Sequence, residues 1–260
     1  MKKAHFLVTI LISVLSLPAA FSQGNDLSYK DDTVKLKGYY VPAAKKNKNK
    51  SPGIIIVHAW MGITDHEKSS ATKLGAAGYN VLAADIFGEN IRPTSVKEAS
   101  ATSGYYKKNY TVYHSRIKAA METLIKQGTD PDNIVIMGYC FGGTGAIEAG
   151  RAGLPVKGIV SFHGGLGKDS LRANTPIKAR VLILHGADDP YVPEKDIKKF
   201  QQELREGNTD WEMIYYANAV HAFTDPAAGT DNSKGAAYNK LADERSWKEM
   251  LAFLSEVFKK

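Results

Sequence analysis

The sequence predicts an α/β protein with a mostly parallel central sheet and helices on both faces. Its apolar runs are short and nearly continuous, as in strands that are covered on both sides. Amphipathic stretches with helical spacing separate these runs, and this alternation is typical of parallel sheets. The chain has 260 residues, of which 43% are hydrophobic, and it has no internal repeat. One sizeable core is therefore expected.

The first 22 residues have the pattern of a secretory signal peptide. Lys2 and Lys3 precede the apolar run "FLVTILISVLSL" (6–17), and "PAAFS" (18–22) supplies small residues for cleavage after Ser22. We therefore expect residues 1–22 to be a signal peptide and 23–260 to be a single domain that is exported, either periplasmic or secreted. The alternative is an uncleaved N-terminal anchor. No other run is long enough to span a membrane, so no stable membrane insertion is expected.

Seven strands are predicted from the apolar runs. The first, 33–41, alternates between polar and apolar residues and is interpreted as an edge or hairpin strand. The others are nearly continuous runs and are interpreted as buried strands: 53–58, 80–85, 133–139, 156–163, 180–186 and 211–216.

Helices are predicted between and after these strands. Residues 111–128 place apolar side chains on one face and stop at Gly128. A helix from 193 to 204 begins at Pro193, which suits a first helical turn. Residues 234–258 have the pattern of a long closing helix. The tyrosine-rich stretch 105–110 is either a lid or a packed helical excursion, and no role is assigned to it.

The charge balance is mildly basic. Formal net charge falls from +7 to +5 when the leader with its two lysines is removed. The run "KKNKNK" (45–50) is interpreted as a solvated loop between two strands, so no nucleic-acid partner is expected.

Six polar side chains end the predicted strands or follow them directly. Ligands of parallel sheets bind outside the carboxyl ends of the strands, so these residues mark a candidate site. They are His58, Asp85, Cys140, His163, Asp189 and His221. The histidines do not have the spacing of zinc ligands, and no metal is expected.

The most informative stretch is "GYCFGG" (138–143), which contains the only cysteine of the chain. It follows a predicted strand and opens a predicted helix, which is the context of a nucleophile elbow with cysteine in place of serine. The N-terminal end of that helix favours the thiolate of Cys140. The backbone amide of Phe141 can face a developing oxyanion. A buried, inert cysteine is the alternative.

A nucleophile of this type needs a base and an orienting acid, and both follow in the expected chain order. His221 lies in a loop after the last strand and is the candidate base. Asp189 is the candidate acid, with Asp188 as the alternative. The loop after strand 53–58 would supply a second oxyanion donor, the amide of Trp60.

Four segments together resemble the dienelactone hydrolase family of the α/β-hydrolases. They are "GYCFGG", "HGADDPYVP" (185–193), "HAFTDP" (221–226) and "YNKLADERSWKEMLAFL" (238–254). The resemblance implies an α/β-hydrolase fold, an ester or lactone substrate, no metal and no organic cofactor. It also implies a triad of Cys140, Asp189 and His221, with the amides of Trp60 and Phe141 as the oxyanion hole.

The sequence departs from the family pattern at three positions. The family's glutamate before the oxyanion donor corresponds to Ala59, so the thiol would be activated by His221, by the helix end, or by Asp65 or Glu67.

The two substrate-binding arginines of the family correspond to Asp225 and Glu89, and Arg92 is near the second position without aligning with it. Acidic residues there would repel an anionic dienelactone. His58, Ala59, Glu89, Arg92, His163 and Asp225 are the candidate pocket residues.

These observations predict an exported hydrolase that cleaves small ester or lactone substrates through a thioacyl-enzyme. The alternative is a binding or redox-sensing protein on a hydrolase scaffold, suggested by Ala59 and by a reactive thiol in an oxidising compartment. The sequence leaves the oligomeric state open between monomer and dimer.

Overall fold

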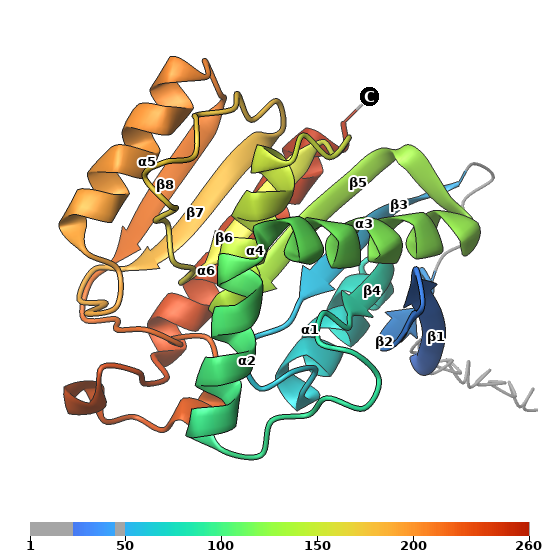
Figure 1. Ribbon diagram of the computed structural model, residues 1–260, viewed down its shortest axis with the longest axis horizontal. Helices are drawn as coiled ribbons and strands as arrows, with labels where there is room; N and C mark the ends of the chain where they lie inside the picture. The colour runs from blue at the N-terminus through green and yellow to red at the C-terminus, as the bar shows by residue number, and fades with distance from the viewer. Residues whose placement is uncertain (1–22, 45–49, 260) are drawn as a thin grey trace, which may run out of the picture.

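The computed structural model describes residues 23–44 and 50–259. Their centre is an eight-stranded sheet with the strand order β1-β2-β4-β3-β5-β6-β7-β8 (Figure 1). Strands β3 to β8 run parallel, and β2 joins them antiparallel to β4. The strands are β1 (Asn25–Asp31), β2 (Val34–Val41), β3 (Ser51–Val57), β4 (Asn80–Ala84), β5 (Thr129–Tyr139), β6 (Gly158–Phe162), β7 (Arg180–Gly186) and β8 (Trp211–Tyr216).

Helices cover both faces of the sheet. In Figure 1, α2, α3, α4 and α5 lie in front of the sheet, and α1 and α6 lie behind it. The helices are α1 (Asp65–Ala76), α2 (Val96–Lys108), α3 (Tyr110–Lys126), α4 (Phe141–Arg151), α5 (Glu194–Glu206) and α6 (Lys240–Val257), and the short 3₁₀ turns are η1 (Pro226–Ala228) and η2 (Asn232–Lys234). The predicted α/β architecture is confirmed.

Strand β3 shows why the core has two halves. Its side chains alternate between the faces: Ile55 and Val57 pack under the front helices, and Ile54 and Ile56 pack against α1 and α6. All four are fully buried. A strand covered on both sides must be apolar at every position, and this produces the continuous run in the sequence.

Strand β1 and helix α1 were not predicted, because neither carries a strong apolar pattern. Only Tyr29 is buried in β1, which forms the edge of the sheet and pairs with β2. The inner face of α1 is made largely of small and polar residues, including Glu67 and Ser70.

The closing helix begins six residues later than predicted. The 3₁₀ turn η2 and Gly235, with a φ of +76°, break the chain before Asn239 caps α6. The predicted signal peptide 1–22 lies outside the described residues, as do positions 45–49 of the basic run. Among the helices that the structure describes, none combines the length and apolarity needed to cross a membrane.

Candidate active site

Cys140 occupies a strained turn between β5 and α4. Its φ of +54° lies in the left-handed region, which is rare for residues other than glycine. The flanking glycines allow the turn to be tight. A β-carbon on Gly138 would lie 2.1 Å from the carbonyl oxygen of Gly142, and one on Gly142 would lie 1.9 Å from that of Val57. Larger residues at either position would push α4 away from the sheet.

His221 and Asp189 lie beside this turn. Nδ1 of His221 is 2.8 Å from Oδ2 of Asp189, and the opposite side of the ring hydrogen bonds to Cys140. Asp189 is buried, and its Oδ1 accepts a 2.9 Å hydrogen bond from the amide of Tyr191. Asp188 is exposed. Of the two candidate acids, the structure therefore brings Asp189 to the histidine.

The electrostatic environment favours a thiolate–imidazolium pair. Burial raises the pKa of the Cys140 thiol, but the hydrogen bond and charge of His221 outweigh burial and hold that pKa below its ordinary value. Lys107 and the Phe141 amide lower it further. Burial lowers the pKa of His221, whereas its hydrogen bonds to Asp189 and Cys140 raise that pKa to about 10.

The loop after β3 presents the Trp60 amide. Glu67 is fully buried and holds this loop: its Oε1 accepts from the Ala59 amide at 3.0 Å, and its Oε2 accepts from the amide and hydroxyl of Thr64 at 2.8 and 2.6 Å. Within the described part of the chain, the Trp60 amide donates to no protein acceptor.

His58 is a buried structural residue. Its Nδ1 donates to the carbonyl of Ala59 at 2.6 Å, and its Nε2 accepts from the amide of Ile86 at 3.2 Å. Burial lowers its pKa, so it stays neutral. His58 therefore ties the loop after β3 to the loop after β4 and has no ring nitrogen left for a substrate.

His163 contacts Cys140 directly. Its Nδ1 lies 3.1 Å from the backbone nitrogen of Cys140, and its ring meets the ring of His221 edge-on at 5.3 Å between centroids. Burial holds the pKa of His163 well below its ordinary value, and the charge of His221 adds to this effect.

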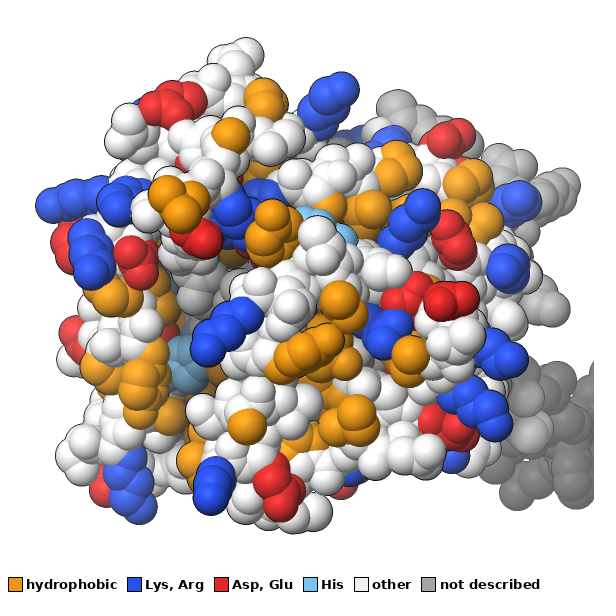
Figure 2. All heavy atoms as spheres, in the orientation of Figure 1, with side chains coloured by type: hydrophobic (Ala, Val, Ile, Leu, Met, Phe, Trp, Pro, Cys, Tyr) orange, Lys and Arg blue, Asp and Glu red, His pale blue; other side chains and the backbone are white. Residues whose placement is uncertain are grey.

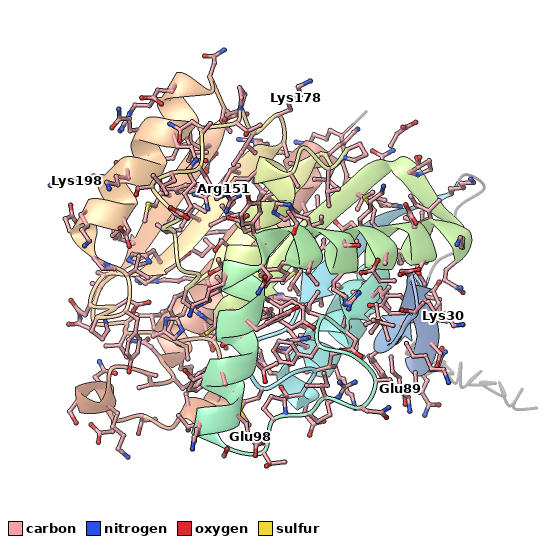
Figure 3. The ribbon with its side chains drawn as sticks, viewed as in Figure 1. Lys30, Glu89, Glu98, Arg151, Lys178 and Lys198 are labelled. Carbon is pink, nitrogen blue, oxygen red and sulfur yellow. The ribbon has the colours of Figure 1, made fainter. Side chains whose placement is uncertain are left out.

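Glu89 and Arg92 follow β4, and Arg92 lies close to the loop after β3: its Cδ would be 3.6 Å from a β-carbon on Gly62. The Glu89 amide donates to Lys35 of β2, and Figure 3 shows Glu89 on the side of β1 and β2. Arg92 is bound to the carboxylate of Asp85 and to backbone carbonyls. Both belong to the loop after β4, which folds back onto the β1–β2 hairpin.

Asp225 lies four residues after His221 but serves the backbone. Its carboxylate accepts from the amide of Ala227 at 2.9 Å and caps η1. The repulsion of an anionic substrate by Glu89 and Asp225 stays a prediction.

Sequence reasoning missed two residues of the site. Thr224 is buried, and its hydroxyl lies 2.9 Å from Nε2 of His163. Lys107, at the end of α2, acts on the charge of Cys140. Only the tertiary structure brings α2 close to Cys140.

The start of α1 did have a signal in the sequence. Thr64 is followed three residues later by Glu67, which is the pattern of a capping box at the start of a helix.

A hollow accompanies these residues on the front of the molecule. Figure 2 shows a histidine side chain at the base of a depression between α2 and the loops that follow β7 and β8. A separate cavity of about 560 Å³ has a lining that includes Lys107, Thr144 and Arg172. Thr144 is one helical turn after Cys140 on α4. Among the described residues, no group of three or more His, Cys, Asp or Glu could hold a metal ion.

The family model of the dienelactone hydrolase family matches residues 37–258, nearly all of the described chain. The chain belongs to the dienelactone hydrolase family. Membership confirms the resemblance read from the sequence, and the chain is therefore a hydrolase of ester or lactone bonds.

Three similar proteins illustrate the match. A Salmonella typhimurium protein named "Putative carboxymethylenebutenolidase" is 25% identical over 260 residues, covering 95% of this chain and 88% of its own length. The crystal structure of a dienelactone hydrolase-like promiscuous phosphotriesterase, P91 from metagenomic libraries, is 33% identical. It superposes with a TM-score of 0.85 over 91% of this chain and 99% of its own. A dienelactone hydrolase structure from Klebsiella pneumoniae, 21% identical with a TM-score of 0.76, shares the fold.

Proposed function

We propose that the protein hydrolyses esters or lactones with Cys140 as nucleophile, His221 as base and acid, and Asp189 as the residue that orients His221. The observation that carries this proposal is the chain of hydrogen bonds from Asp189 through His221 to Cys140. It ends at a thiol whose pKa lies below its ordinary value. Such a chain is the working arrangement of nucleophilic catalysis.

Acylation begins from the thiolate–imidazolium pair. The sulfur of Cys140 attacks the carbonyl carbon, and the carbonyl π electrons move to the oxygen, which the amides of Trp60 and Phe141 stabilise. When the tetrahedral intermediate collapses, the bond to the alkoxide breaks and the alkoxide takes the proton of His221. The products are the alcohol and a thioacyl-enzyme.

Deacylation reverses these roles. Neutral His221 takes a proton from water, and the resulting hydroxide attacks the thioester carbonyl in the same oxyanion hole. The carbon–sulfur bond then breaks, the acid leaves, and the thiolate is restored beside the imidazolium. No cofactor is needed for either half.

The substrate is a small ester or lactone with no required negative charge. The positions that hold arginine in the prototypes are Asp225 and Glu89 here, and the Arg92 guanidinium is bound to Asp85.

A phosphotriester is the second candidate substrate. The 33% identical relative P91 is described as a promiscuous phosphotriesterase. The same thiolate and the same two amides could act on a phosphoryl centre. Hydrolysis of diethyl p-nitrophenyl phosphate by the purified protein, lost on Cys140→Ala, would support this activity.

The central experiment is hydrolysis of p-nitrophenyl acetate and butyrate by the parent, Cys140→Ala and His221→Ala. We expect both variants to lose on the order of 10²–10⁴-fold in rate, because each removes a group that acts in the transition state. Unchanged turnover in Cys140→Ala would contradict the proposal. If the parent hydrolysed no ester while Cys140 was still alkylated rapidly, the redox-sensing or binding function would be favoured instead.

We also propose that the protein is exported and that residues 1–22 are removed. The charged start, the apolar run and the small residues before Gln23 support this proposal. N-terminal sequencing of the secreted or periplasmic protein from a bacterial expression host is expected to begin at Gln23. Recovery of the intact chain in the membrane fraction would instead support an uncleaved anchor.

A further inference from the structure

The backbone amide of Cys140 has an unusual second acceptor. It donates to the carbonyl oxygen of Phe162 at 3.0 Å and also to Nδ1 of His163 at 3.1 Å. Because the amide can only donate, Nδ1 of His163 must be unprotonated, and the neutral ring must carry its proton on Nε2.

Thr224 completes this arrangement. Its hydroxyl oxygen lies 2.9 Å from Nε2 of His163, where it accepts the ring proton. The hydroxyl of Thr224 lies 3.4 Å from Nε2 of His66, a half-buried residue of α1. Thr224 and His163 are 3% and 2% exposed, so water does not compete for these bonds. The Cys140 amide thus sets the tautomer of His163, and the Thr224 hydroxyl holds the ring by accepting its Nε2 proton.

His163 also touches the base. Its ring meets the rings of His221 and Phe223 edge-on, at 5.3 and 5.1 Å between centroids. Burial keeps the imidazole uncharged, and the histidines around it, His221, His66 and His185, act in the same direction. A neutral ring here does not repel the imidazolium of His221, whereas a charged one would.

The backbone at these positions is strained on both sides of the contact. Cys140 has a φ of +54° and His163 a φ of +41°. Left-handed conformations of such residues cost of order 1–3 kcal/mol each and persist only where the surroundings hold them. The hydrogen bond between the Cys140 amide and His163 joins the two strained residues directly.

We propose that His163 is a positioning residue that fixes Cys140 against His221, and that Thr224 holds the His163 ring in place for this purpose. The inference rests on Cys140 being the nucleophile of the proposed function. Without the acceptor on His163, the Cys140 amide keeps only the Phe162 carbonyl, the strained turn is held less tightly, and the sulfur moves away from His221. The thiolate then loses the partner that stabilises it.

The test measures the rate of Cys140 alkylation by iodoacetamide as a function of pH in the purified protein. In His163→Gln the amide reaches toward Thr224 but leaves no acceptor at the Nδ1 position. Alkylation near neutral pH should fall about tenfold, because each unit of rise in the thiol pKa lowers the thiolate fraction tenfold. In His163→Asn the amide oxygen takes the Nδ1 position, and most of the rate should return.

Two further variants keep the test decisive. Thr224→Val removes the hydroxyl and should slow alkylation by about threefold, the equivalent of half a pKa unit. If the circular dichroism spectra show that the His163 variants do not fold, Thr224→Val alone tests the inference. His185→Gln is the matched control, since His185 is an equally buried histidine near the end of β7 with no hydrogen bond to Cys140 among the described residues.

Parent-like alkylation in a folded His163→Gln or in Thr224→Val would overturn the inference. The inference would also be overturned if His163→Gln and His163→Asn slowed alkylation equally, or if His185→Gln slowed it as much as His163→Gln. Because iodoacetamide needs no turnover, this result is separate from ester hydrolysis. A parent that alkylates rapidly but hydrolyses no ester would contradict the proposed function alone.

Discussion

At the scale of single residues, the chemistry depends on the protonation of Cys140 and His221 together. Burial alone would keep both groups neutral. Asp189, held at 2.8 Å from Nδ1 of His221, supplies the negative charge that makes the imidazolium favourable, and the imidazolium in turn favours the thiolate. In the proposed mechanism, this mutual effect favours a thiolate–imidazolium pair before attack.

This charge state predicts a distinctive pH dependence for ester hydrolysis. The rate should rise as the Cys140 thiol ionises, at a pH below the ordinary thiol pKa of 9.0. It should fall as pH rises through about 10, where His221 loses its proton.

The same shift makes the stability of the fold depend on pH. Because the pKa of His221 is raised from 6.5, the contribution of this residue to the free energy of unfolding is complete below pH 6.5 and is lost as pH rises through about 10.

The measurement compares kcat/KM for an ethyl ester and for p-nitrophenyl acetate across this pH range. The alkoxide of the ethyl ester needs the proton of His221, whereas p-nitrophenolate leaves without it. The alkaline fall should therefore appear with the ethyl ester and be much weaker with the p-nitrophenyl ester. An acid limb at the ordinary thiol pKa would show that the resting pair is uncharged.

At the scale of elements, the start of α1 shapes the oxyanion loop. Glu67 forms a capping box with Thr64 and also accepts from the Ala59 amide, so one carboxylate satisfies three donors. The same bonds that begin the helix hold the chain on both sides of Trp60. The Glu67 carboxylate, at the start of α1, thus holds the loop after β3 that contains the Trp60 amide.

Glu67→Gln is expected to lower kcat for ester hydrolysis by about 10- to 100-fold, because misplacing the Trp60 amide weakens an oxyanion donor. The glutamine has one acceptor oxygen for donors that need two, and its NH₂ group would face an N–H donor. Cys140 alkylation should stay at the parental rate. An equal loss of alkylation would mean that Glu67 acts on the thiol, and exposed Asp65→Asn serves as the control.

At the scale of the whole molecule, a buried ionic network joins elements that surround the site. Glu148 of α4 pairs with Arg151, Arg172 and His114 at 2.9 Å each. Arg151 also reaches Glu203 of α5 at 2.7 Å and the carbonyl of Leu166 at 3.1 Å. Figure 3 shows Arg151 in the region between α4 and α5. The network fixes the loop after β6 beside the cavity.

Glu148→Gln should reduce the free energy of unfolding by about 3–5 kcal/mol near neutral pH, because it leaves buried cations without their partner. Burial raises the pKa of Glu148, but hydrogen bonds from His114, Arg172 and Arg151 lower it to about 2. The contribution of Glu148 is therefore present above 4.5 and is lost as pH falls toward 2.

Urea unfolding of parent and variant at about pH 7 and about pH 3 tests this, and the difference between them should shrink in acid. Glu122→Gln is the matched surface control on α3, where the pair with Lys118 is more than half exposed and should contribute less than about 1 kcal/mol. A constant difference at both pH values would show that Glu148 contributes through packing rather than charge.

The sequence by itself determined the alternating architecture, the elbow at Cys140 and the chain order of cysteine, aspartate and histidine. These features are local: buried strands must be apolar, and a tight strand-to-helix turn requires Gly138 and Gly142. Only the tertiary structure decided between Asp188 and Asp189, paired Arg92 with Asp85, and brought His163 to Cys140, Thr224 to His163 and Glu67 to the loop after β3. These contacts depend on which side chains meet at the edge of the sheet. The residue pattern within one segment does not reveal its distance from segments that are far away in the chain.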